Sequence, residues 1–111
     1  MAANYKVLGQ ADLTTTSDTN VYTVPAATEA VISTIVIANR GASATTFNLA
    51  VRPDGEALAN KHYLANGVAI AAKDSTTLTL GITMNATDVI TVAAGTANFI
   101  SVNVFGAEIP A

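Results

Sequence analysis

The chain has 111 residues, of which 50% are hydrophobic and only 12% are charged, and it contains no cysteine. These figures predict one small domain and exclude disulfides, thiolate metal sites and a cysteine nucleophile. The net charge of −3, with only five scattered basic residues, argues against a nucleic-acid partner, which needs a basic surface. Because an ordinary soluble domain is about 25% charged, we expect part of this surface to be buried against other copies of the chain.

No apolar run approaches the roughly 18 residues that a membrane-spanning helix needs. The N-terminal residues also lack the basic segment and apolar core that mark a signal peptide. The sequence therefore predicts a protein that is made and used without export and has no membrane partner.

Residues 1–20 stand apart from the rest of the chain. The short apolar segment Tyr5–Leu8 is followed by the polar run Thr14–Asn20. This pattern fits either an edge strand with a loop or an arm that pairs with the exposed sheet edge of a neighbour. We therefore divide the chain into residues 1–20, as an arm or edge strand, and residues 21–111, as a β-sandwich domain. Deleting residues 1 to 18 should weaken attachment to a partner and leave the sandwich folded.

Strand patterns follow along the remaining chain. Val31–Ala38 is apolar on both faces and rich in β-branched residues, which predicts a central strand covered on both sides. Hydrophobic and polar residues alternate over Phe47–Arg52, Leu78–Met84 and Ile100–Val104, and Val89–Ala94 is a further short strand. The expected core comprises Ile35, Ile37, Phe47, Leu49, Val51, Leu78, Leu80, Ile82, Val89, Val102 and Val104.

Turn signals rich in Gly, Asn, Asp and Pro separate these runs at short intervals, including Pro53–Gly55, Asn66–Gly67 and Asn85–Asp88. About eight strands result, which predicts an all-β fold, an antiparallel β-sandwich or jelly roll. The segment Gly55–Leu64 breaks the alternation and fits either one helical turn or a long crossover connection.

His62 is the only histidine, and Asp54 and Glu56 lie near it in the sequence. A carboxylate could orient the ring as a general base, but a partly exposed histidine in a connection is the commoner case. One histidine, no cysteine and scattered acids do not supply a nucleophile, a base and an orienting group. We predict no enzymatic activity, no metal and no cofactor, and expect the change of His62 to Ala to leave stability and assembly nearly unchanged.

Arg40 and Arg52 each end an apolar strand. They are either solvated strand ends or partners for an acid of a neighbouring subunit, because arginine is enriched at interfaces. The predicted interface residues are Tyr5, Val7, Leu8, Arg40, Arg52, His62 and Tyr63.

Several segments carry a resemblance to a known family. They are Val21–Pro25, Val31–Gly41, Phe47–Pro53, Lys61–Tyr63, Leu78–Thr83, Ala86–Val89 and Phe105–Ile109. Together they resemble small β-rich virion structural proteins of tailed bacteriophages, cyanophages included. The similarity spans about Val21 to Ile109, and its motifs are structural rather than catalytic.

The resemblance implies a virion protein that is assembled in the host cytoplasm. Its simplest form is a decoration or cement protein of the head, bound to the major capsid protein or other virion proteins and forming a homotrimer. The alternatives are a tail, baseplate or fibre-associated subunit and a host-surface or carbohydrate-binding module. With six aromatic residues and no tryptophan, the chain has little material for stacking on sugars.

Overall fold

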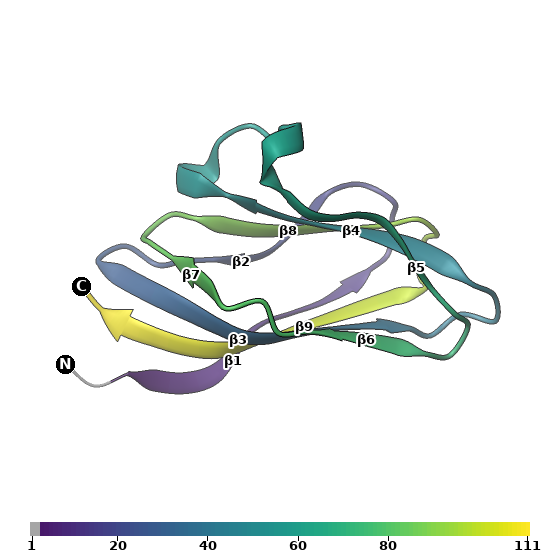
Figure 1. Cartoon of the computed structure of the whole chain (residues 1–111), viewed down its shortest axis with the longest axis horizontal. Helices are drawn as coiled ribbons and strands as arrows, with labels where there is room; N and C mark the ends of the chain where they lie inside the picture. The colour runs from purple at the N-terminus through teal and green to yellow at the C-terminus, as the bar shows by residue number, and fades with distance from the viewer. Residues whose placement is uncertain (1–2) are drawn as a thin grey trace.

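The computed structural model describes residues 3–111, which form two antiparallel sheets packed face to face (Figure 1). Sheet A contains β1 (Asn4–Leu13), β9 (Ile100–Pro110), β3 (Thr28–Asn39), β6 (Ser75–Leu78) and β7 (Ile82–Met84). Sheet B contains β2 (Thr19–Thr23), β8 (Val89–Ala94), β4 (Thr45–Arg52) and β5 (Tyr63–Ile70). The expectation of an all-β antiparallel sandwich is confirmed.

The strand order is that of a jelly roll. Sheet A runs β1-β9-β3-β6 and sheet B runs β2-β8-β4-β5. The strands β6 and β7 both pair with β3 and occupy one edge position in succession. The fold therefore has eight strand positions, as the spacing of the turn signals predicts.

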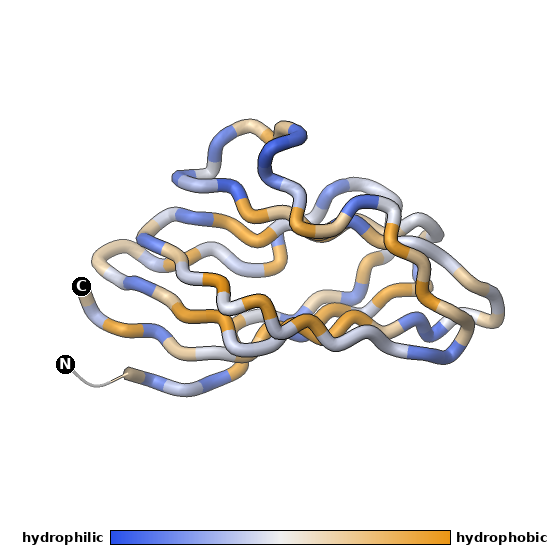
Figure 2. Tube along the Cα trace, viewed as in Figure 1, coloured by the Kyte–Doolittle hydropathy of each residue, from blue (hydrophilic) through white to orange (hydrophobic). Residues whose placement is uncertain are grey.

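The core lies between the sheets, where alternate residues of the facing strands meet. Hydrophobic positions recur along the strands of both sheets in Figure 2. Seven of the predicted core residues are buried, namely Ile35, Ile37, Phe47, Leu49, Val89, Val102 and Val104. Other residues outside the predicted core set are buried with them, including Leu13, Val24, Ile90 and Ile100.

Leu80 does not belong to the core, because half of its surface (50%) is exposed. Strand β6 ends at Leu78, and Gly81 has a φ of +63°, which takes the chain out of extended geometry before β7 begins. Val51, Leu78 and Ile82 are only partly buried. The expected core is therefore too large at the β6–β7 edge, which holds Leu78, Leu80 and Ile82, and at Val51 near the end of β4.

The central strand β3 has one covered face rather than two. Ile35 and Ile37 lie in the core, whereas Val31 on the opposite face is exposed. Among residues 3–111 no helix or strand packs over this outer face of sheet A. Its apolar residues therefore need an explanation other than the core of this chain.

The segment 1–20 lies within the sandwich over its described part. Strand β1 pairs with β9 from Asn4 to Leu13, and the Leu13 side chain is buried in the core. The strand bends at a register shift between Val7 and Gly9. A Cβ atom at Gly9 would lie 2.5 Å from the carbonyl oxygen of Val21, so only glycine allows β1 to approach β2 this closely. Of the two sequence alternatives, the structure has the edge strand, and Met1 and Ala2 lie outside the described residues.

The non-alternating segment after β4 forms a loop with two single 3-10 turns. These turns are η1 (Pro53–Gly55) and η2 (Asn60–His62). The loop projects above sheet B in Figure 1 and leads directly into β5. Asn66–Gly67, predicted as a turn, instead lies inside β5, where the pairing with β4 shifts register between Phe47 and Leu49.

Candidate interaction surface

The outer face of sheet A carries an apolar patch on its β1–β9–β3 part. The patch, called the outer patch below, is made by Tyr5, Val7, Val31, Phe105, Ala107 and Ile109. These residues surround a shallow hollow of about 530 Å³. Tyr5 is 85% exposed and Val7 is 48% exposed, although both are apolar in character. A contiguous apolar surface of this kind is typical of a binding surface.

The strand register explains why these side chains share one face. Tyr5 lies opposite Ala107, and Val7 lies opposite Phe105. On the other side of β9, Val31 also lies opposite Ala107. Directly paired residues of antiparallel strands project from the same face, so three strands supply one surface.

The same face becomes polar beyond the bend of β1. Gln10 donates a hydrogen bond to the Oδ1 atom of Asn103 at 2.7 Å. Asp12 lies 2.5 Å from the Nη2 atom of Arg40. The bend therefore separates an apolar half of the outer face from a polar half on the same strand.

The one basic residue beside the outer patch already has a partner. The Nζ atom of Lys6 lies 2.6 Å from the Oε1 atom of Glu108. Tyr22, from sheet B, donates a hydrogen bond to the Oε2 atom of the same carboxylate at 2.6 Å. The hydrogen bonds from Lys6 and Tyr22 lower the pKa of Glu108. The pKa of Tyr22 is raised, mainly by burial of its side chain and also by its hydrogen bond to Glu108. This cluster ties the two sheets together and leaves the outer patch without an unpaired positive charge.

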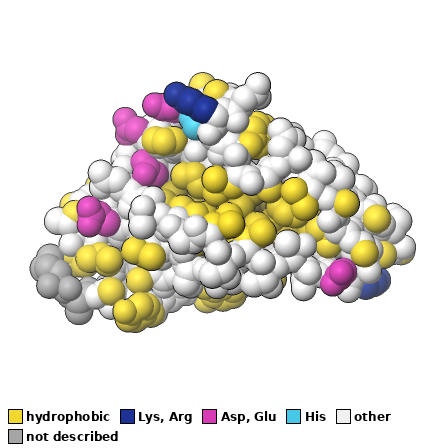
Figure 3. All heavy atoms as spheres, viewed as in Figure 1, with side chains coloured by type: hydrophobic (Ala, Val, Ile, Leu, Met, Phe, Trp, Pro, Cys, Tyr) yellow, Lys and Arg dark blue, Asp and Glu magenta, His cyan; other side chains and the backbone are white. Residues whose placement is uncertain are grey.

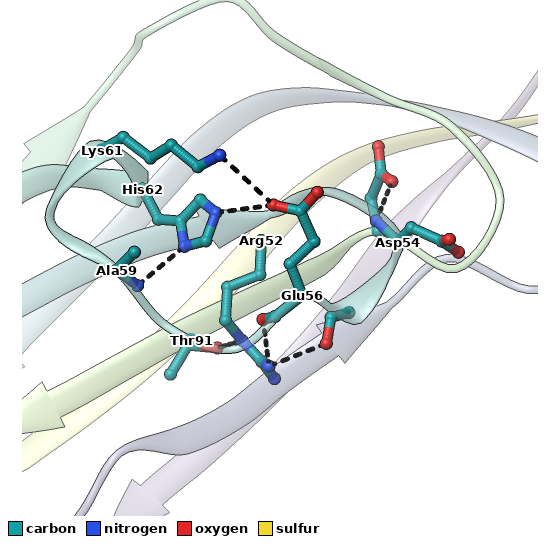
Figure 4. A network of polar contacts seen from close by, with 9 residues as sticks. Arg52, Asp54, Glu56, Ala59, Lys61, His62 and Thr91 are labelled. Carbon is teal, nitrogen blue, oxygen red and sulfur yellow. Dashed lines mark hydrogen bonds and ion pairs between the residues drawn. The ribbon is translucent and has the colours of Figure 1, made fainter.

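A second polar cluster holds the loop above sheet B, as Figure 4 shows. Arg52 donates from Nε to Thr91 Oγ1 at 3.0 Å and from Nη1 to the Glu56 carbonyl oxygen at 2.9 Å. Its Nη2 atom donates to Asn20 Oδ1 at 2.8 Å. Arg52 therefore joins β4, β8, β2 and the loop within one chain.

His62 lies beneath this loop and is only 5% exposed, so the expectation of a partly exposed ring is wrong. Its Nδ1 atom accepts a hydrogen bond from the Ala59 backbone N–H at 3.0 Å, and its Nε2 atom lies 3.2 Å from Glu56 Oε1 (Figure 4). Lys61 lies 3.8 Å from the same carboxylate oxygen. Both ring nitrogens are engaged within the loop, so the ring helps to hold the loop in place.

The predicted interface residues therefore separate into groups. Tyr5 and Val7 meet on the outer patch, whereas Leu8 packs against the core. Arg52, His62 and the half-buried Tyr63 belong to the loop and the start of β5 on sheet B. Arg40 bonds to Asp12 and to the Asn98 carbonyl oxygen at the polar half of sheet A.

Sequence reasoning missed the contributions of β9 and β3 to the outer patch. Phe105, Ala107 and Ile109 are apolar at alternate positions, and this alternation was the available signal. The β-bulge between Ile32 and Thr34 moves Phe105 and its neighbours relative to β3. A Cβ atom at Gly106 would lie 2.1 Å from the Val31 carbonyl oxygen, so this close approach needs glycine.

Figure 3 shows one face of the molecule, on which hydrophobic side chains form a band across the middle and charged side chains are few.

In the part of the chain that the structure describes, no three His, Asp or Glu side chains form a cluster that could hold a metal ion. Over the same residues, no helix is long and apolar enough to cross a membrane.

Comparison with known proteins gives no match to this chain among protein-family models, curated proteins or solved structures.

Proposed function

We propose that this protein is a non-enzymatic structural subunit of a tailed-phage particle, a decoration protein that stabilises the head shell. The observation that carries the proposal is the outer patch, an uncovered apolar surface on a small jelly roll. Burying apolar surface contributes roughly 25 cal/mol per Å², so covering this patch would supply binding energy without charged side chains. The proposal also rests on the resemblance to phage virion proteins, since a jelly roll alone serves many functions.

In this role the outer patch packs on the major capsid protein, and the subunits form trimers on the shell. The sparse charge supports the proposal because a subunit covered by neighbours has less surface to keep in water. The Arg52–His62 cluster supports the non-enzymatic part, because its hydrogen bonds are made within the chain.

A tail, baseplate or fibre-associated subunit is the second candidate, because an apolar patch serves equally well between tail proteins. The copy number in purified particles separates the two locations. Quantitative mass spectrometry should give a number comparable with that of the major capsid protein for a head protein. A number far lower, as the smaller symmetric assemblies of a tail require, would place the protein in the tail.

Attachment through the outer patch is tested by a matched pair of variants. Val7→Glu places a charge on the patch, whereas Gln10→Glu places the same charge on the same strand beyond the bend. We expect Val7→Glu to lose binding to heads that lack the protein and Gln10→Glu to retain it. Equal binding by both variants would contradict attachment through the patch.

A further inference from the structure

Half of β1 has an open edge. Strand β1 is the outermost strand of sheet A, and within residues 3–111 only β9 pairs with it. Its second half is turned towards β2 at Gly9, whereas Asn4, Tyr5, Lys6 and Val7 are all exposed. The unpaired backbone groups of an exposed edge form a template for another strand.

This edge lacks the features that usually block such pairing. Proteins protect sheet edges with proline, bulges or unpaired charges. From residue 3 to Val7 there is no proline, the bulge comes after Val7, and the charge of Lys6 is paired with Glu108. The other three edges are less regular, since β2 and β5 carry register shifts and Gly81 interrupts the β6–β7 edge.

The edge and the outer patch together define what can bind there. The occupant must be an extended strand, because only a strand pairs with an edge, and it needs apolar side chains at alternate positions to continue the patch. The occupant must also be without unpaired charges where it contacts the outer patch, because the patch has no unpaired charge to pair with them. Strand β1 meets each condition itself, with Tyr5 and Val7 projecting from the patch side.

We propose that two copies of this chain pair through the first half of β1, antiparallel, about a two-fold axis at Tyr5. In this register Tyr5 lies opposite Tyr5 of the second copy, and Lys6 lies opposite Asn4 of the second copy. Moving the axis to Lys6 would place two lysines directly opposite each other, which is destabilising. The register at Tyr5 instead gives an aromatic cross-strand pair.

The pairing joins two copies of sheet A into one continuous sheet. A two-fold axis perpendicular to this sheet places both outer patches on the same side, so the apolar surface is doubled rather than covered. The inference therefore deepens the proposed function, because the enlarged surface would be the one that packs on the shell. A two-fold contact of this kind joins two copies into a dimer.

Single-cysteine variants test the pairing directly, because the chain has no cysteine of its own. Under mild oxidation in the absence of particles, Tyr5→Cys should cross-link to a covalent dimer. Ser17→Cys, in the exposed loop after β1, is the control. Paired thiols have an effective concentration in the millimolar range, so at micromolar protein we expect Tyr5→Cys to cross-link on the order of a hundredfold faster.

The register has its own test. A mixture of Asn4→Cys and Lys6→Cys should form mixed dimers faster than Lys6→Cys alone forms dimers, because residues 4 and 6 of the two copies are directly opposite. Sedimentation of the unmodified chain is an independent measurement of the pairing, and a mass of two copies is expected.

A monomer at every concentration, or cross-linking of Tyr5→Cys no faster than that of Ser17→Cys, would overturn the pairing. Faster homodimer formation by Lys6→Cys than by Tyr5→Cys would overturn the register and with it the axis at Tyr5. The cross-linking and sedimentation experiments use the protein without phage particles. A negative result in them would overturn the pairing of β1, while the copy number in particles and the Val7→Glu result could still support the proposed function.

Discussion

Replacing Tyr22 with Phe should destabilise the fold by removing a single hydroxyl group from the link between the sheets. The ring of Tyr22 is buried and its hydroxyl donates to Glu108 at 2.6 Å, so Phe keeps the packing and loses the hydrogen bond. Hydrogen bonds to charged groups contribute about 1.5–3 kcal/mol. Glu108 retains Lys6 as a partner and is partly open to solvent. We therefore expect the free energy of unfolding to fall by about 1–2 kcal/mol at neutral pH.

The pH dependence of this difference follows from the two pKa shifts. Burial and Glu108 raise the pKa of Tyr22 above its ordinary value of 10.0, so the folded protein favours the neutral phenol. That contribution is complete below pH 10 and is lost as the pH rises further. The bonds from Lys6 and Tyr22 lower the pKa of Glu108 below its ordinary value of 4.5, so this contribution is complete above that pH and is lost as the pH falls.

The difference in stability between the native protein and Tyr22→Phe should therefore be constant from about pH 5 to 9 and shrink on both sides. Urea unfolding followed by circular dichroism across this range measures it. Tyr5→Phe is the matched control, because the Tyr5 side chain is 85% exposed and its variant should unfold like the native protein. A loss below about 0.5 kcal/mol at pH 7, or a loss unchanged at pH 11, would refute the reasoning.

Three further predictions can be checked by the same unfolding assay. His62→Ala should lower the free energy of unfolding by about 1–3 kcal/mol, because it removes a buried ring with two hydrogen bonds. This replaces the expectation from the sequence that the change leaves stability nearly unaltered. Lys61→Ala on the exposed side of the loop should change the free energy of unfolding by less than about 0.5 kcal/mol, and equal effects of the two variants would contradict a structural role for the ring. Deleting residues 1–18 should abolish the cooperative transition, contrary to the expectation from the sequence that the sandwich stays folded, because strand β1 covers β9 and contributes the core residue Leu13. A truncated chain that unfolds cooperatively would show that β1 is dispensable. Ile37→Ala should cost about 2–5 kcal/mol and Leu80→Ala less than about 1 kcal/mol, and the reverse order would contradict the boundary of the core at the β6–β7 edge.

The strands were predictable because a half-buried antiparallel sheet leaves a period of two in the sequence. The alternation over Phe47–Arg52 and Ile100–Val104 placed their inward residues correctly. It gave no account of where a strand stops, so Leu80 was counted with the core although Gly81 ends the extended run. Asn66–Gly67 was predicted as a turn, whereas Gly67 donates its backbone N–H to Asn48 Oδ1 at 2.6 Å within a bulged strand.

The outer patch was only partly predictable. Tyr5 and Val7 were expected at an interface because they are apolar residues near a chain end, but the partners of these residues lie about a hundred positions away on β9. Local patterns do not contain that pairing, and the bulges at Gly9 and Ile32 shift it further. The burial of His62 was mispredicted for the same reason, since it depends on a loop that Arg52 of β4 joins to β8 and β2.

The antiparallel pairing of β1 with β9 also decides where foreign sequence can be attached. Asn4 lies opposite Glu108, so both described ends of the chain lie side by side next to the outer patch (Figure 1). A folded tag joined at either end would therefore stand beside the surface that we propose to be covered on the particle. The loop between η1 and η2 lies over the opposite sheet (Figure 1), and Ala57 and Ala59 within it are exposed. In the proposed attachment to a shell, insertion there would display a peptide on the outer side while leaving both the patch and the β1 edge free.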